Sequence, residues 1–157
     1  MNTGTIKYKL LPDAAPIAAG NFVALAKSGY FNNTKCHRLT TTANFKVLQC
    51  GDPAGNGTGG PNYEWGPIEN APADAMYKKA YIAMARRGGN AESMGSQFFL
   101  VYGDTSIPAD AAGGYSVFGE VTSGIDTIEE VGKRGTTDGS QDGPPKFDVT
   151  IKGVELF

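Results

Sequence analysis

The run CHRLTTTANFKVLQCGD, residues 36–52, decides how this chain of 157 residues is expected to fold. It contains the only histidine, His37, both cysteines, and Arg38 among apolar and β-branched residues. Residues 36–39 and the apolar alternation at the end of the run predict two strands, and the polar residues 40–44 predict the turn between them. In such a hairpin Arg38 is either an ordinary surface side chain in an ion pair or a functional residue, and the run alone does not decide.

Composition narrows the class of protein and of partner. The formal net charge is −2, with 14 basic and 16 acidic side chains and no basic block, so we expect neither nucleic acid binding nor direct membrane contact. We expect one domain over residues 1–157. The first ten residues, MNTGTIKYKL, lack the pattern of a signal peptide. We therefore expect a cytoplasmic location, with an extracytoplasmic one as the alternative if an N-terminal anchor was trimmed.

The two cysteines limit metal and disulfide chemistry. Two cysteines and one histidine are too few for a disulfide framework, and they make a zinc site an unfavourable reading, so no metal is expected. Cys36 and Cys50 could face each other across the hairpin, where a disulfide is geometrically conceivable. We expect two reduced, packed thiols, with the disulfide as the alternative.

The rest of the chain reads as short strands with two helices. Alternation predicts a strand over residues 5–10, and Asp13 is expected to cap a helix that ends near Gly29. A second helix is expected after a Ser123 cap, with Ile125, Ile128 and Val131 facing inward. Further strands are expected over residues 81–85, 97–102, 115–121 and 147–156. With 22 glycines and nine prolines, this pattern favours a mainly β fold: a closed eight-stranded antiparallel β-barrel capped by two α-helices.

Several kinds of active site lack their parts. Gly55, Gly57 and Gly60 fit G-x-G-x-x-G loosely, but proline and asparagine follow at once and no helix begins, so a surface loop is the better reading. There is no G-x-S-x-G, and adjacent Cys36 and His37 point to opposite faces of a strand. What remains is an arginine, two glutamines and apolar side chains from separate strands. This set suits a site that binds a peptide and polarises it without covalent chemistry.

Four segments in the expected order resemble the cyclophilins, the family of peptidyl-prolyl cis–trans isomerases, and in particular their single-domain bacterial type. AAPIAAGNFVALAKSGYFNNTKCHR resembles the first helix and the F-H-R motif, and LQCGDPAGNGTGGPNY resembles the Q-G-G-D-P loop. IAMAR and GSQFFLVY resemble the segment with M-A-N and G-S-Q-F-F, and YSVFGEV resembles the V-F-G strand. The resemblance implies rotation about X–Pro peptide bonds, without a covalent intermediate or a cofactor.

The resemblance also implies which residues form the site. Arg38 follows the histidine of F-H-R, and Gln49 is the glutamine of the loop motif; both are implied to be catalytic. The residues implied to bind substrate are Phe45, Val47, Ala85, Arg86, Gln97, Phe99, Ile107 and Tyr115. Arg38 is expected to donate to the prolyl nitrogen, Gln49 to position Arg38 or to hold the substrate carbonyl, and His37 to be a packed neighbour with a satisfied ring.

Departures from the family pattern concern the same site. The hairpin from Arg38 to Gln49 is about three residues longer than usual. Phe45 therefore lies one position early, and we expect a bulge to return its ring to the wall of the proline pocket. Arg86 replaces an asparagine that contacts substrate through its backbone, and Tyr115 replaces a histidine. Residues 106–108 (SIP) stand where many members have a tryptophan, so cyclosporin A is expected to bind weakly at most.

The expected partners are proline-containing peptides and unfolded or folding proteins, bound by a monomer. Two other functions stay open at this point. A proline-peptide binding or chaperone module with weak catalysis is favoured by the longer hairpin and the displaced Phe45. A nucleotide-binding protein would have to use the glycine loop.

Overall fold

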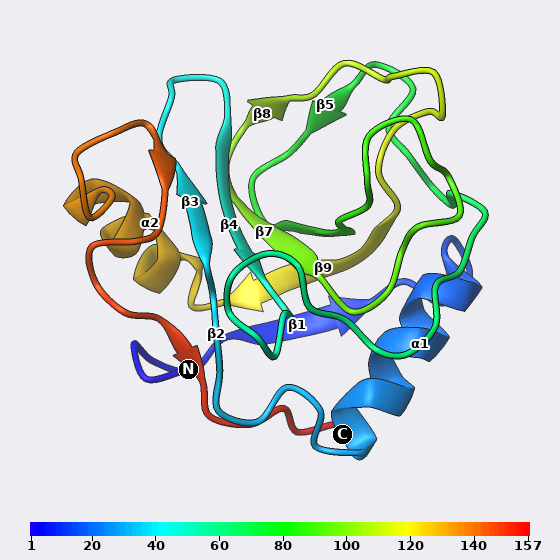
Figure 1. The fold of residues 1–157 in the computed structure, drawn as a ribbon, viewed down its shortest axis with the longest axis horizontal. Coiled ribbons are helices and arrows are strands. Elements are labelled where there is room, and N and C mark those ends of the chain that lie inside the picture. The colour runs from blue at the N-terminus through cyan, green and yellow to red at the C-terminus, as the bar shows by residue number, and fades with distance from the viewer.

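The structure, a computed structural model, describes all residues 1–157 and is mainly β with two helices, as predicted (Figure 1). The helices are α1 (Pro16–Lys27) and α2 (Ile125–Arg134). The strands are β1 (Lys7–Leu10), β2 (Thr34–Lys35), β3 (Arg38–Thr40), β4 (Lys46–Cys50), β5 (Met76–Tyr77), β6 (Tyr81–Met84), β7 (Phe98–Gly103), β8 (Thr105–Ser106), β9 (Val117–Ser123), β10 (Asp142–Gly143) and β11 (Thr150–Ile151). Neither helix is long and apolar enough to cross a membrane.

Seven strands form one antiparallel sheet in the order β1-β9-β6-β7-β4-β3-β10. Two further antiparallel pairs, β11-β2 and β5-β8, lie outside it. In Figure 1, α1 and α2 lie at opposite sides of the molecule with the strands between them. The antiparallel sheet and the two helices agree with the sequence. Closure into an eight-stranded barrel stays a prediction.

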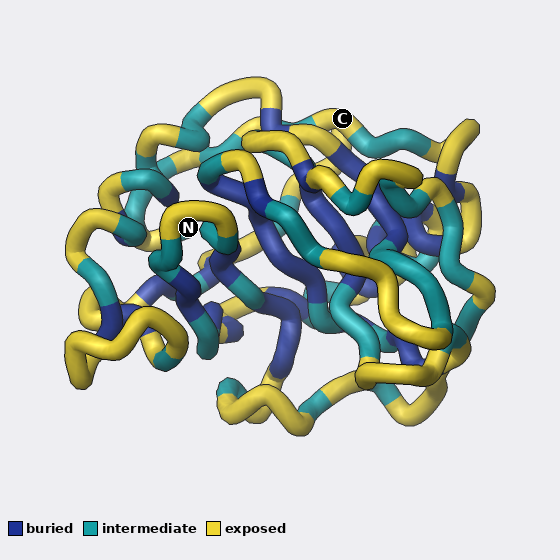
Figure 2. The backbone as a smooth tube through the Cα atoms, turned by 90° about the horizontal axis from the view of Figure 1, so that it is seen from above, coloured by how far each residue is buried: buried dark blue, intermediate teal, exposed yellow.

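Strand alternation divides the buried apolar side chains between the two faces of the sheet. On β4, Leu48 and Cys50 belong to the larger core, which also contains Phe22 of α1 and Ile128 of α2. Val47, on the opposite face of β4, belongs to a second, smaller cluster. The buried side chains of β7 are divided between the same two clusters. The dark blue segments in Figure 2 follow the strands through the interior, and exposed loops surround them. The smaller cluster lies on the face of the sheet that bears the candidate site.

The ends of the two helices differ from the prediction. The N-cap of α1 is Ala15, not Asp13, and no side chain of its own segment caps it. Instead Glu69 reaches in from a distant loop and accepts hydrogen bonds from the backbone N–H groups of Ile17 and Ala18, at 3.1 and 2.9 Å. An acidic side chain at this end of a helix is favourable because the first N–H groups have no partner within the helix.

Helix α2 begins at a glycine rather than at a capping serine. Its N-cap is Gly124, with φ 88°, whereas Ser123 still belongs to β9. A Cβ at Gly124 would lie 2.4 Å from the carbonyl oxygen of Thr5, so the close approach and the positive φ both require glycine. The inward face is as expected, because Ile128 and Val131 are buried and Ile125 packs against the larger core.

The two cysteines form a disulfide, so the expectation of reduced thiols is wrong. Cys36 precedes β3 and Cys50 ends β4, and both side chains are buried in the larger core. The bond joins the two arms of the hairpin at the end away from its turn. It therefore fixes the base of the hairpin that carries Arg38 and Gln49.

Candidate functional site

The site begins with a cross-strand pair on the hairpin. Arg38 on β3 is directly opposite Gln49 on β4, so the two side chains leave the same face of the sheet. Arg38 Nη1 donates a hydrogen bond to Gln49 Oε1 over 3.3 Å. The arginine and glutamine that the sequence predicted to act together are therefore neighbours.

Arg38 also holds an acidic partner that lies far away in the sequence. Arg38 Nε and Nη2 donate to the two carboxylate oxygens of Asp142, both over 2.8 Å. These hydrogen bonds raise the pKa of the Arg38 guanidinium and hold the pKa of the Asp142 carboxyl below its usual range. The guanidinium also lies 5.7 Å from the centre of the Phe45 ring, over its face. Arg38 is thus both an ion-pair partner, as the plainer reading of the sequence had it, and part of the candidate site.

A chain of amide groups continues from Gln49 into the glycine loop. Gln49 Nε2 donates to Gln97 Oε1 over 2.8 Å. Gln97 Nε2 donates to the carbonyl oxygens of Gly57 and Gly59, over 3.0 and 2.9 Å. These contacts fix the orientation of both side-chain amides, since each amide oxygen accepts and each amide nitrogen donates. The two glutamines and Arg38 therefore form one connected network.

Asp52 shapes the glycine loop. Its side chain is fully buried, and its carboxylate accepts hydrogen bonds from the backbone N–H groups of Ala54, Asn56 and Gly57, over 2.7, 3.0 and 2.6 Å. Burial acts to raise the pKa of Asp52, but the backbone N–H donors hold its pKa below the usual range. A Cβ at Gly59 would lie 1.9 Å from Asp52 Oδ1, so the loop can close around the carboxylate only with glycine there.

The smaller apolar cluster brings the predicted apolar site residues together. Its buried members include Val47 of β4 and Phe99 of β7. The predicted residues that are partly buried and pack against it are Phe45, Ala85, Ile107 and Tyr115. The rings of Phe99 and Tyr115 meet edge to face with centroids 5.6 Å apart. Because Arg38 lies over Phe45, the charged group is at the border of an apolar surface built from several strands and loops.

The bulge expected in the hairpin beside Phe45 is absent, because the register that pairs Arg38 with Gln49 continues as far as Thr42 and Phe45. The pairing of β4 with β7 does shift between Lys46 and Val47, but the extra residue there is Tyr102 of β7. Val47 is buried beneath the surface, with 2% of its area exposed, whereas Phe45 is only half-buried. Phe45 is therefore the side chain of the two that can meet a substrate, and Val47 supports it from below.

The side chain of Arg86 is turned into the protein, so the predicted contact with substrate is left to its backbone. Its side chain has no exposed area, pairs with Asp110 over 2.9 Å, and donates to the carbonyl oxygens of Gly113 and Gly114. The guanidinium also lies 4.6 Å from the centre of the Tyr115 ring. The Arg86 side chain thus holds the loop before β9 and the ring of Tyr115, and only its backbone is left to contact a substrate.

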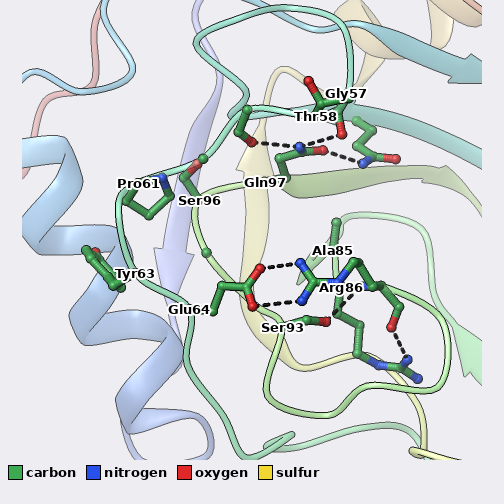
Figure 3. A pocket seen from close by; sticks show the side chains of 15 residues that line it. Gly57, Thr58, Pro61, Tyr63, Glu64, Ala85, Arg86, Ser93, Ser96 and Gln97 are labelled. Atoms are coloured by element: carbon green, nitrogen blue, oxygen red, sulfur yellow. Dashed lines mark hydrogen bonds and ion pairs between the residues drawn. The ribbon is translucent and has the colours of Figure 1, made fainter.

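A polar cavity of about 460 Å³ adjoins the amide network. Four predicted site residues line it: Gln49, Ala85, Arg86 and Gln97. Figure 3 shows Gln97 bonded to the glycine loop on one side of this cavity, with Glu64 and Ser93 on the other. Ala85 belongs both to the cavity wall and to the apolar cluster, so the two surfaces are continuous.

His37 packs beside the glycine loop, as expected. Its ring was also expected to have all its hydrogen bonds satisfied, and this is not so. A Cβ at Gly57 would lie 3.4 Å from its Cδ2 atom, whereas its buried Nδ1 atom has no hydrogen-bond partner. Burial lowers the pKa of His37. The histidine is therefore neutral at pH 7 and supports the loop from beneath.

All ten predicted residues thus lie in one region. Six belong to or pack against the apolar cluster, four line the polar cavity, Ala85 does both, and Arg38 lies over the ring of Phe45. Two residues that organise the site were not singled out from the sequence, Asp52 and Asp142. Asp52 stood within the recognised loop motif, where an acidic residue amid glycines is a sequence signal for N–H contacts. Asp142 lies 104 residues from Arg38, and nothing in the local sequence distinguishes it from other loop carboxylates.

Comparison with known proteins assigns the family. The model of the family described as cyclophilin type peptidyl-prolyl cis-trans isomerase/CLD matches residues 1–156. The probable peptidyl-prolyl cis-trans isomerase B of Mycobacterium leprae (strain TN) is 40% identical over 166 residues, which cover 99% of this chain and 54% of the relative. The protein of the same name from Mycobacterium tuberculosis (strain ATCC 25618 / H37Rv) is also 40% identical, with 99% and 52% covered. The chain spans about half the length of these relatives.

A solved structure agrees with this assignment. The cyclophilin type peptidyl-prolyl cis-trans isomerase of Cryptosporidium parvum, crystallised in the presence of the dipeptide Ala-Pro, superposes with a TM-score of 0.77. It is 29% identical in sequence, and the match covers 97% of this chain and 92% of that chain. The chain belongs to the cyclophilin-type peptidyl-prolyl cis–trans isomerase family.

Proposed function

We propose that this chain is a peptidyl-prolyl cis–trans isomerase that acts on proline-containing peptides and on unfolded or folding proteins. The observation that carries the proposal is the position of Arg38, a charged donor at the border of an apolar surface formed with Phe45 and Phe99. A proline ring fits against such a surface, and the guanidinium then lies within reach of its amide. No covalent intermediate and no cofactor are needed.

The energetic demand on the site is modest. Rotation about an X–Pro amide is opposed by a barrier of about 18–20 kcal/mol, because the nitrogen lone pair is delocalised into the carbonyl. Uncatalysed exchange takes tens to hundreds of seconds, or about 10⁻² s⁻¹. An ordinary turnover of about 10 s⁻¹ therefore requires roughly a thousandfold acceleration, close to 4 kcal/mol.

Arg38 can supply part of this acceleration. In the twisted transition state the prolyl nitrogen becomes pyramidal and basic, so a donor aimed at it binds the transition state better than the planar ground state. A hydrogen bond from a charged group contributes about 1.5–3 kcal/mol. Phe45, Phe99 and Ile107 would supply the rest by holding the ring and excluding the water that stabilises the planar amide. Gln97 and the backbone of Ala85 would hold the peptide.

Two-dimensional exchange NMR on a tetrapeptide containing Ala-Pro tests the proposal. An isomerase produces cross-peaks between the cis and trans signals at substoichiometric protein concentration, whereas a proline-peptide binding module shifts the signals without exchanging them. Absence of catalysed exchange in the presence of demonstrable binding would refute the isomerase and leave the binding module.

We also propose three finer properties of the domain. It is a monomer, and it binds cyclosporin A weakly because Ser106, Ile107 and Pro108 offer no large flat ring; gel filtration and isothermal calorimetry test these points. The sheet closes into the predicted barrel through the segment before β1, a proposal supported by the hydrogen bond that the backbone N–H of Asn2 donates to the carbonyl of Thr150 in β11 over 2.9 Å. Slow exchange of the Asn2 amide would support this closure, and fast exchange would refute it.

We propose an extracytoplasmic location, the alternative weighed from the sequence. The Cys36–Cys50 disulfide supports it, because disulfides persist in oxidising compartments. Acid quenching of intact cells, followed by alkylation under denaturing conditions and mass spectrometry of the protein, distinguishes paired from free cysteines. Two alkylated cysteines would favour the cytoplasm.

A further inference from the structure

The contact between Asp142 and Arg38 goes beyond a surface ion pair. We propose that Asp142 is a positioning residue for the isomerisation, which fixes the guanidinium of Arg38 in the orientation that presents its remaining donors to the prolyl amide. This inference rests on the proposed function of the same site. It assigns a role to the loop between α2 and β11, which contributes nothing else to the site.

The loop is built to hold Asp142 in place. β10, which contains Asp142, pairs with β3, so the carboxylate comes from the strand beside that of Arg38. The backbone N–H of Thr41 donates to the carbonyl of Gln141 over 2.9 Å, which continues the pairing. Ser140 Oγ donates to the carbonyl of Asp142 over 3.0 Å. Asp142 is therefore anchored on both sides through its backbone.

A buried threonine supports this anchor. Thr136 has 3% of its area exposed, and its hydroxyl donates to the carbonyl of Ser140 over 2.5 Å. The Asp138 carboxylate accepts a hydrogen bond from the backbone N–H of Ser140 over 3.0 Å. An exposed loop that only linked two elements would not need such a network. Here the network sets the backbone from which Asp142 points.

The donors of Arg38 divide between the protein and a substrate. A guanidinium has five N–H groups. Two of them, on Nε and Nη2, form a fork on the two oxygens of Asp142, and one on Nη1 goes to Gln49. One N–H on each terminal nitrogen is left. These two donors can approach the prolyl nitrogen and the carbonyl oxygen of the same peptide bond.

Asp142 is the principal restraint on this arrangement. The bond from Arg38 to Gln49 is long, at 3.3 Å, and the contact with the Phe45 ring has no directional requirement comparable to a hydrogen bond. The Arg38 side chain is 39% exposed, so without the carboxylate it has room to adopt other rotamers. A fork with two parallel hydrogen bonds fixes the plane of the guanidinium as well as its position. Catalysis by a single donor depends on that orientation.

The test compares Asp142→Asn with a matched control, Asp148→Asn. Asp148 lies farther along the same segment and pairs with Lys35 over 3.0 Å, but it is remote from Arg38 in the hydrogen-bond network. Both exposed pairs contribute little to stability. Asparagine at position 142 keeps the size of the side chain but can accept only one of the two bonds, so kcat should fall by about tenfold while KM stays within about twofold. Asp148→Asn should leave both constants unchanged.

The same two substitutions in an Arg38→Ala background separate positioning from a general structural effect. If Asp142 acts through Arg38, Asp142→Asn causes no further loss of kcat when Arg38 is absent. An equal loss in both backgrounds, or unchanged kcat in Asp142→Asn, would overturn the inference while the isomerase stands. An inactive wild-type chain would overturn the proposed function, and the inference with it.

Discussion

Replacing Asp52 by alanine should reduce the free energy of unfolding by about 3 kcal/mol. The buried carboxylate accepts three backbone N–H groups from the glycine loop. A hydrogen bond to a charged group contributes about 1.5–3 kcal/mol, so three bonds give at least about 4.5 kcal/mol. Part of that is recovered in the variant, because water can reach the loop N–H groups, and the cost of burying a charge disappears.

Chemical denaturation followed by tryptophan fluorescence measures this change, since Trp65 is the only tryptophan and is partly buried. Asp74→Ala is the matched control. Asp74 is exposed and its carboxylate accepts one backbone N–H, that of Met76, over 3.0 Å, so its removal should cost less than about 1 kcal/mol. A loss in Asp52→Ala no larger than that of the control would show that the carboxylate does not organise the loop.

The remaining predictions concern the hairpin. Reducing the Cys36–Cys50 disulfide, which spans 14 residues, should lower the free energy of unfolding by about 3 kcal/mol in the same denaturation assay, and an unchanged midpoint with reductant would contradict this. Burial lowers the pKa of His37 in the folded protein, so the unfolded chain takes up the proton first as pH falls below about 6.5. The free energy of unfolding should therefore drop by at most about 1.4 kcal/mol per pH unit until the pKa of the folded state is reached. Thermal unfolding between pH 7 and 5 measures this slope, and His37→Asn should remove it; a slope that persists in the variant would assign it elsewhere. Phe45→Ala should weaken peptide binding with little loss of stability, whereas buried Val47→Ala should cost about 2 kcal/mol of stability. Peptide titration and chemical denaturation of both variants measure these effects. If Val47 were the residue that meets substrate, Val47→Ala rather than Phe45→Ala would weaken binding.

Local patterns in the sequence carried much of the fold and of the site. The apolar run over residues 97–102 predicted β7, and the strand–turn–strand pattern of residues 36–52 predicted the hairpin that carries Arg38 and Gln49. These features depend on neighbours in the chain or on a motif that many sequences share, so a single sequence contains them.

Contacts between distant loops could not be predicted in the same way. Glu69 caps α1 from 51 residues away, in place of the adjacent Asp13. Asp142 reaches Arg38 from a loop that reads as an ordinary polar connection. A single polar side chain leaves no period in the sequence, and its partner is set only when the sheet has brought the two loops together. The burial of the Arg86 side chain could not be predicted for the same reason, since its partners lie 24 to 28 residues further along.

We propose that Arg38 acts on the transition state of prolyl rotation rather than on the binding of the peptide. Catalysed cis–trans exchange of an Ala-Pro tetrapeptide by NMR, together with the Kd of the same peptide, tests this in the wild-type chain and in Arg38→Ala. Exchange should fall at least about tenfold, as the loss of a charge-assisted hydrogen bond requires, while Kd changes by less than about twofold and the fold is retained. Exchange at the wild-type rate in Arg38→Ala would refute this role of Arg38.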